Sequence, residues 1–190
     1  MYQTTDFRKN LKIELEGKVY VIIKSEHTNP GKGSAFVRVR MKNLETGQVL
    51  EKTFKSGVTT GCTKPDLEEK EMEYLYADPD GFNFMDQATY ETVNLSADSI
   101  GEATGYLQEG MRLKVLYYNG RPIDVELPNF VELRVKETDP GLKGDTAQGG
   151  TKKAIMETGL QINVPLFIEE NELIKVDTRT GEYVERVKEK

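Results

Sequence analysis

Short runs of alternating apolar residues dominate this chain and limit its fold more than any other feature. Leu11, Ile13 and Leu15 alternate with charged residues, and a period of two returns in later runs. Because successive side chains of a β-strand point to opposite faces, this period predicts half-buried strands. Glycine, proline and asparagine separate the runs, so we expect short strands joined by turns and almost no helix. The later runs cover residues 19–23, 36–41, 49–54, 72–76, 111–118 and 130–135.

The predicted strands form three groups, which we interpret as three consecutive small β-barrels in residues 1–64, 65–127 and 128–190. The middle group has five strands and a short helical stretch, capped by Ser96, between the third and the fourth. This is the usual order of an OB barrel. In its last hairpin, Asn119-Gly120 supplies the two positive-φ positions of a type I′ turn. A long polar loop, residues 138–151, interrupts the third group, and loops of this length are often functional.

Composition excludes several classes of protein. No apolar run approaches the length of a membrane span, and the N-terminus lacks the basic and apolar segments of a signal peptide. The single cysteine, Cys62, can form no internal disulfide. We therefore expect a cytoplasmic protein, without contact to a membrane, in which Cys62 is a small buried or half-exposed thiol.

The net charge of −6 hides an uneven distribution along the chain. Residues 1–64 carry 12 Lys and Arg against 6 Asp and Glu, a charge of +6, whereas residues 65–127 carry 4 against 14, a charge of −10. Residues 128–190 carry 10 against 12, a charge of −2. The basic first third predicts a polyanionic partner, with the acidic middle kept away from it or facing a cationic protein. A charge trend that only improves solubility is the alternative.

No arrangement of residues predicts catalysis, a metal site or a cofactor. His27 is the only histidine, so a metal site or proton relay built on several histidines is excluded. Around Gly31-Lys32 the chain lacks the earlier glycine and the following Ser or Thr of a Walker phosphate loop. The acidic run at residues 66–73 has no partnering cluster and fits a solvated strand edge. We therefore expect a binding protein and not an enzyme.

One turn between two predicted strands is unusual. Its residues are Pro30, Gly31, Lys32, Gly33 and Ser34. Glycine on both sides of Lys32 permits positive φ angles and close approach to another surface, and the proline stiffens the entry. Lys24, Arg38, Arg40 and Lys42 add positive charge on the flanking strands. The pattern suggests a lysine presented to a polyanion, although such a turn also occurs with no function.

Several separated stretches resemble one family. Residues 30–36, Pro-Gly-Lys-Gly-Ser-Ala-Phe, and residues 51–56, Glu-Lys-Thr-Phe-Lys-Ser, are similar to the N-terminal KOW-like domain of bacterial elongation factor P. Residues 128–133 and 138–146 resemble its domain junction and third-domain loop. Parts of its C-terminal signature follow at residues 153–154, 158–159, 164–167 and 174–179, and at Tyr183 and Arg186. The resemblance covers essentially the whole chain.

One position departs from the family pattern. Asn171 stands where the family commonly has glycine. Asparagine is the next-best residue for a left-handed backbone conformation, so we expect this conformation to be kept.

The resemblance implies an all-β, L-shaped protein with a KOW-like (SH3-like) barrel followed by two OB-fold barrels. It implies a translation elongation factor that binds the 70S ribosome between the peptidyl-tRNA and exit sites and relieves stalling at consecutive prolines. In the family, the lysine at the position of Lys32 reaches the CCA end of peptidyl-tRNA and is often extended by a modifying enzyme. The third-domain loop, here with Gly144, Asp145 and Thr146, lies on the small subunit. The family also suggests a monomer.

Contacts with tRNA or ribosomal RNA are expected at three places in the chain. The residues are Arg38, Arg40, Lys42, Lys143, Gly144, Asp145, Thr146, Tyr183 and Arg186. Phosphate neutralisation by basic residues would dominate the affinity of the first third for RNA.

Two other interpretations stay open at this stage. Within the family, the sequence does not separate elongation factor P from a paralogous elongation-factor-P-like protein. A general RNA-binding protein built of OB barrels would stack bases on exposed aromatic side chains. Tyr74, Tyr76, Phe82 and Phe84 are the candidates for such stacking, although their alternate positions on strands predict that they belong to the core.

Mass spectrometry distinguishes the two chemical states of Lys32. An extended Lys32 resists trypsin, so digestion of natively expressed protein yields residues 25–38 as one peptide that is heavier than its sequence mass. A bare Lys32 is cleaved and leaves the intact mass equal to that of the sequence.

Overall fold

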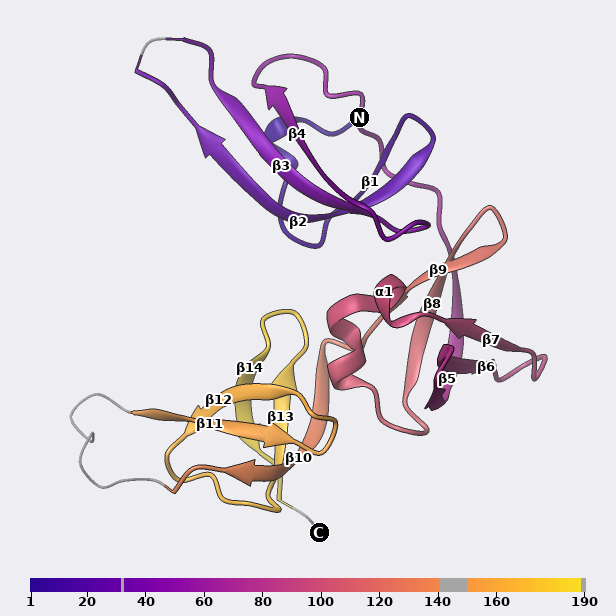
Figure 1. The fold of residues 1–190 in the computed structure, drawn as a ribbon, viewed down its shortest axis with the longest axis vertical. Helices are drawn as coiled ribbons and strands as arrows, with labels where there is room; N and C mark the ends of the chain where they lie inside the picture. Colours follow the sequence, from indigo (N-terminus) through magenta and orange to yellow (C-terminus); the bar gives the residue numbers. More distant parts are fainter. Residues whose placement is uncertain (32, 141–149, 189–190) are drawn as a thin grey trace. The chain divides into compact units, whose positions relative to one another are not determined.

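The computed structural model describes residues 1–31, 33–140 and 150–188 and consists mostly of β-strands (Figure 1). The predicted all-β class is confirmed. The chain forms two compact units, Met1–Glu69 with Leu116–Asp124, and Lys70–Val115 with Val125–Lys190. These two units do not test the predicted division into three barrels at residues 1–64, 65–127 and 128–190, which stays a prediction.

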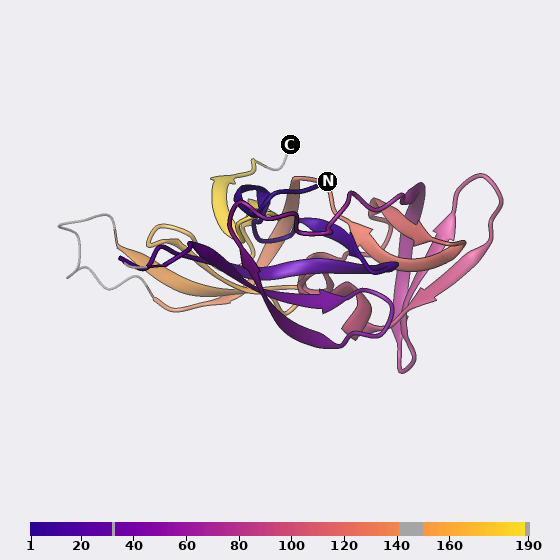
Figure 2. The same ribbon diagram turned by 90° about the horizontal axis from the view of Figure 1, so that it is seen from above.

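The first sheet has four antiparallel strands in sequence order, as the alternating runs predict. Its strands are β1 (Lys12–Leu15), β2 (Lys18–Thr28), β3 (Phe36–Asn43) and β4 (Val49–Lys55), preceded by a 3-10 turn, Thr4–Asp6. The hairpin of β2 and β3 extends past the short β1 (Figures 1 and 2). Val37, Val39 and Met41 are fully buried in its core, where Phe7 packs edge-on against Phe54 with ring centroids 5.1 Å apart.

Strand β2 contributes to two hydrophobic clusters. Tyr20 and Ile22 face the core of the first sheet. Val19 lies on the other face and packs against Leu116 and Ile123, which belong to the same compact unit. Because the two clusters cover both faces at the start of β2, the run 19–23 does not simply alternate between core and solvent. A β-bulge between Ile22 and Lys24 then shifts the register of β2 against β3.

Cys62 lies in the core of the first sheet and is fully buried. Its backbone N–H donates a hydrogen bond to Thr60 Oγ1 at 3.1 Å. Burial raises the pKa of the thiol, since the thiolate would lose its hydration. The expectation of a buried thiol is confirmed.

The second sheet has the strand sequence of an OB fold, with the order β7-β6-β5-β8-β9. Its elements are β5 (Glu68–Asp78), β6 (Gly81–Asp86), β7 (Thr92–Leu95), α1 (Ala97–Ile100), the 3-10 helix η2 (Gly101–Tyr106), β8 (Arg112–Tyr118) and β9 (Arg121–Glu126). Ser96 caps the helix as predicted, because its Oγ accepts a hydrogen bond from Ser99 N–H at 3.2 Å. The α-helix ends at Gly101, whose φ of 56° suits glycine, and a 3-10 turn replaces the rest of the expected helix.

The predicted Asn119-Gly120 turn of this sheet is confirmed. Asn119 and Gly120 have φ angles of 50° and 75°, as a type I′ turn requires. In the turn before β6, Asp78 Oδ1 accepts hydrogen bonds from Asp80 N–H at 2.9 Å and from Gly81 N–H at 3.0 Å. Short polar side chains at the first turn position stabilise turns in this way.

The aromatic residues of the second sheet are divided between core and surface. Tyr74 and Phe84 are buried, whereas Tyr76 is 52% exposed. A register shift between Tyr74 and Tyr76 turns the later residue away from the core. The expectation that Tyr76 belongs to the core is therefore wrong.

The third sheet has the order β12-β11-β10-β13-β14. Its strands are β10 (Phe130–Thr138), β11 (Thr151–Met156), β12 (Gln161–Pro165), β13 (Leu173–Asp177) and β14 (Glu182–Arg186). Leu133, Val135, Met156 and Ile174 are fully buried in its core. Asn171 has a φ of 66°, so the expected left-handed conformation is kept at this position.

We expect Gly81→Ala to destabilise the second sheet strongly. Gly81 has a φ of 149°, and an added Cβ would collide with the backbone carbonyl of Leu95 and lie 2.8 Å from Asn94 Oδ1. The collision should cost about 1–3 kcal/mol beyond the cost of the backbone strain. The measurement is the free energy of unfolding in urea, followed by circular dichroism.

Gly110→Ala is the matched control for this substitution. Gly110 has a φ of 79° with no atom within 4 Å of the added Cβ, so only the left-handed strain of about 1–2 kcal/mol should appear. Equal losses in the two variants would contradict the packing argument.

Candidate nucleic-acid interface

The turn between β2 and β3 is exposed wherever the structure describes it. Pro30, Gly31, Gly33 and Ser34 are all exposed, while Lys32 lies outside the described residues. Gly33 has a φ of 127°, which L side chains rarely adopt, so the expected positive φ is confirmed at this glycine. Next to the turn, Ser56 N–H donates a hydrogen bond to the Ala35 carbonyl at 2.8 Å and ties the start of β3 to the end of β4.

Strand β3 separates its apolar and basic residues cleanly. Its burial alternates along the strand, with Val37, Val39 and Met41 fully buried. Arg38 and Arg40 therefore point to the opposite, exposed face, and Lys42 follows on that face as a half-buried residue. The structure thus brings together the three basic residues that the sequence assigned to RNA contact in the first sheet.

Carboxylates moderate the positive charge of this face. Lys24 Nζ lies 2.5 Å from Glu26 Oε1, and Arg38 Nε lies 3.4 Å from Glu51 Oε1. The hydrogen bond and charge of Lys24 lower the pKa of Glu26. Exposed ion pairs of this kind are worth little in water and exchange readily for other partners. Among the described residues, Arg40 makes no ion pair of its own, so β3 retains this basic group for an anionic partner.

A groove of about 600 Å³ lies beside the start of β3. Residues from four separate segments line it, which explains why sequence reasoning missed it. They are Met1, Tyr2, Gln3, Thr4, Thr5, His27, Asn29, Ala35, Phe36, Ser56, Gly57, Val58 and Thr59. None of these side chains is a carboxylate, a lysine or an arginine, so the groove is lined by neutral side chains next to the basic face of β3.

The second predicted RNA-binding segment falls largely outside the described residues. Lys143, Gly144, Asp145 and Thr146 belong to this undescribed part of the chain. Their roles stay predictions.

Tyr183 and Arg186 both lie on β14, but their environments differ. Tyr183 is half-buried and packs against the core of the third sheet. Arg186 is exposed, and its Nη1 lies 2.9 Å from Glu172 Oε1. The structure therefore gives Tyr183 a packing role in the sheet, and RNA contact by either residue stays a prediction.

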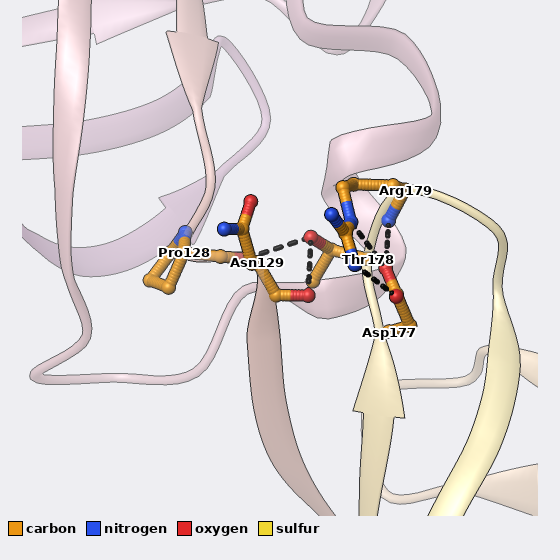
Figure 3. Close-up of polar contacts among 5 residues, drawn as sticks. All are labelled: Pro128, Asn129, Asp177, Thr178 and Arg179. Atoms are coloured by element: carbon orange, nitrogen blue, oxygen red, sulfur yellow. Dashed lines mark hydrogen bonds and ion pairs between the residues drawn. The ribbon is translucent and has the colours of Figure 1, made fainter.

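The turn after β13 makes a polar cluster that the sequence analysis did not predict (Figure 3). Thr178 donates its hydroxyl to the Pro128 carbonyl at 2.7 Å and its backbone N–H to the Asn129 carbonyl at 3.0 Å. These bonds attach the turn to the chain that enters β10. The sequence signal was Asp177 at the first turn position, where aspartate typically accepts backbone hydrogen bonds.

Asp177 and Arg179 form a two-point ion pair within this cluster (Figure 3). Arg179 donates from Nε to Asp177 Oδ1 at 3.0 Å and from Nη2 to Oδ2 at 2.6 Å. Hydrogen bonds from the Arg179 side chain, and then from its backbone, lower the pKa of Asp177 to about 2. The guanidinium carbon lies 5.5 Å from the ring centroid of Phe130.

Sequence profiles of three elongation factor P domains match this chain: the KOW-like domain over residues 3–59, the OB domain over 67–125 and the C-terminal domain over 131–186. A protein named elongation factor P from Moorella thermoacetica is 51% identical over 98% of this chain and 100% of its own length. The chain belongs to the elongation factor P family. A protein named elongation factor P from Bdellovibrio bacteriovorus is 50% identical to this chain over the full length of both.

Membership of the elongation factor P family makes this protein a translation elongation factor, and the family's work involves the ribosome and tRNA. The KOW-like and OB parts of the expected fold are confirmed by the matching domains. Among solved structures, a eukaryotic translation initiation factor 5A from Methanococcus jannaschii aligns with this chain at 20% sequence identity and a TM-score of 0.42. The alignment covers 66% of this chain and 93% of the other protein. This similarity is too weak to support a conclusion.

Within residues 1–31, 33–140 and 150–188, no group of three or more His, Cys, Asp or Glu side chains could hold a metal ion. Of the helices in the same ranges, none is long and apolar enough to cross a membrane.

We expect Arg179→Gln to raise the pKa of Asp177 from about 2 toward its usual value of 3.8, because the variant removes the largest stabiliser of the carboxylate. A carboxylate with a lowered folded-state pKa stabilises the fold above about pH 4, and this contribution is lost as the pH falls toward 2. The measurement is an NMR titration of the side-chain carboxyl carbons.

Asp78 serves as the internal control in that titration. Its pKa is lowered mainly by a hydrogen bond from Asn83, so the arginine substitution should leave its midpoint unchanged. A midpoint for Asp177 that stays near 2 in the variant would contradict the assignment of the shift to Arg179.

Proposed function

We propose that this protein binds the 70S ribosome between the peptidyl-tRNA and exit sites and relieves stalling at consecutive prolines by placing Lys32 beside the CCA end of peptidyl-tRNA. The proposal rests on family membership together with one observation. A glycine-flanked, exposed turn stands at the end of a hairpin whose outward face carries Arg38 and Arg40.

The charge distribution supports contact between the first third of the chain and RNA. Residues 1–64 carry a charge of +6, and the outward residues of β3 add basic groups next to the turn. Neutralising phosphates releases counterions and supplies most of the sequence-independent affinity for RNA. A lysine ammonium is compact, so it enters a narrow space between phosphates without the fixed fork geometry that arginine requires.

The mechanism that we propose involves no bond chemistry by the protein itself. Proline is a constrained nucleophile, and a nascent chain of several prolines holds peptidyl-tRNA out of alignment. Contact between the Lys32 turn and the CCA end restores the alignment, which lowers the entropic part of the barrier while ribosomal RNA performs the transfer. A hundredfold acceleration requires only about 2.7 kcal/mol. A few charge-assisted hydrogen bonds are sufficient for this.

The remaining parts of the proposal follow from the family. The loop with Lys143, Gly144, Asp145 and Thr146 would lie on the small subunit, and Tyr183 and Arg186 would support RNA contact from β14. The protein would act as a cytoplasmic monomer, and a lysine-modifying enzyme would extend Lys32. The acidic residues 65–127 would face a cationic protein and not RNA, because like charges repel phosphates.

We expect Lys32→Ala to abolish most of the stimulation of peptide synthesis across three consecutive prolines. The substitution removes the group that contacts the CCA end, so the rate should fall by about 100-fold toward that of the unassisted ribosome. The measurement is the rate of tri-proline peptide formation in a reconstituted translation reaction, compared with a message without prolines.

Lys18→Ala is the matched control. Lys18 is an exposed lysine in the same sheet, at the start of β2 and therefore at the other end of this strand from the turn. It removes the same charge and should retain the wild-type rate. Undiminished stimulation by the Lys32→Ala protein would refute the role proposed for the turn.

A further inference from the structure

We propose that Arg179 and Phe130 form a platform on which one unpaired RNA base stacks, separately from the Lys32 turn. The stacking platform consists of these two side chains. Phe130 opens β10 and lies directly opposite Asp177, which ends β13, in the antiparallel pairing of the two strands. The Asp177 carboxylate holds the guanidinium of Arg179 over the Phe130 ring, 5.5 Å from its centroid.

The platform is fixed before any partner arrives. Besides its two side-chain bonds, Arg179 donates its backbone N–H to Asp177 Oδ1 at 2.9 Å. The turn itself is closed by a bond from Gly181 N–H to the Asp177 carbonyl at 2.8 Å, and Thr178 attaches it to Pro128 (Figure 3). Side chains that are already ordered lose little entropy on binding, so such a surface binds more strongly than a mobile arginine.

Both members of the platform are open to solvent. The Arg179 side chain is 60% exposed, and Phe130 remains 45% exposed although the arginine lies over it. A large aromatic side chain at the first position of a strand, left uncovered to this extent, loses the free energy that burial would supply. A flat partner that covers the platform would recover it.

The charges around the platform favour a base over a phosphate. Asp177 neutralises Arg179 and occupies its Nε and Nη2 donors. In the same sheet, Lys175 of β13 is paired with Glu185 of β14 at 2.6 Å, and Arg186 of β14 is paired with Glu172, the residue before β13, at 2.9 Å. A phosphate would have to compete with these carboxylates. An unpaired RNA base instead stacks on the planar face of a guanidinium or an aromatic ring, and neither requires a free charge.

The inference rests on the role of the family in translation, which supplies RNA as the partner, and it does not depend on Lys32. The competing explanation is local packing, in which Arg179 merely shields Phe130. Packing predicts that substitutions change stability alone, whereas stacking predicts a loss of RNA contact at unchanged stability. The base belongs either to tRNA or to ribosomal RNA, and base-specific chemical probing distinguishes the two.

The test uses the full-length protein and 70S ribosomes that carry peptidyl-tRNA in the P site. Arg179→Lys keeps the positive charge but removes the planar group, and Phe130→Leu keeps an apolar side chain but removes the ring. Each should weaken binding by about 5- to 150-fold, as expected for one stacked base, with an unchanged dependence on salt. A base of tRNA or ribosomal RNA that the wild-type protein protects from dimethyl sulfate or carbodiimide should become reactive with both variants.

Lys175→Gln is the control for charge. It removes a cation from β13, the strand that ends at Asp177, and leaves both platform side chains in place. The variant should therefore bind within twofold of the wild type. Wild-type affinity of both platform variants would overturn the proposal, as would equal weakening by Lys175→Gln. A loss of affinity that follows a lowered melting temperature in both platform variants would also overturn it, because that is the result of packing alone.

Each of the two proposals can be refuted independently of the other. If Lys32→Ala retains full stimulation while the platform variants lose their base protection, the role of the turn is refuted and the platform stands. The reverse pattern refutes only the platform.

Discussion

The antiparallel pairing of β2 with β3 is the constraint on which the first unit depends. The ladder runs from Tyr20 opposite Asn43 to Thr28 opposite Phe36, and the turn that carries Lys32 closes it. Burial of Val37, Val39 and Met41 fixes the register, because a slip by one residue would place these side chains in water and the arginines in the core. The same alternation therefore stabilises the hairpin and orients its basic face.

In the second unit, hydrophobic packing joins segments that the sequence assigns to different barrels. Tyr106, the last residue of η2, is buried in the core of the third sheet with Leu133 and Ile174. Hydrogen bonds reinforce the contact, since Thr158 donates its hydroxyl to the Gly105 carbonyl at 2.6 Å and Gln108 donates to Glu157 at 2.7 Å. Removing η2 from this place would expose apolar surface and leave polar groups unpaired. The 3-10 helix is thus part of the third core and not only a connection between strands.

The sequence predicted those features that local chemistry determines. The alternating runs placed the strands, Asn119-Gly120 specified a type I′ turn, and Ser96 marked the start of the helix. Tyr76 was not predictable in the same way, because a bulge breaks the period of two and depends on the partner strand. The start of β2 was not predictable because a second hydrophobic cluster covers its other face. The platform of Arg179 and Phe130 arises from the pairing of β10 with β13. The two residues are 49 positions apart in the sequence, so no local pattern predicts their contact. The neutral groove beside β3 is assembled from four segments and escaped prediction for the same reason.

The burial of Cys62 has a practical consequence. It is the only thiol in the sequence, it is fully buried, and its raised pKa keeps it protonated near neutral pH, so maleimides and other thiol reagents have poor access to it. A fluorophore can therefore be attached at one introduced surface cysteine without first replacing a native one. A protein labelled in this way is suitable for single-molecule measurements of binding to the ribosome and dissociation from it.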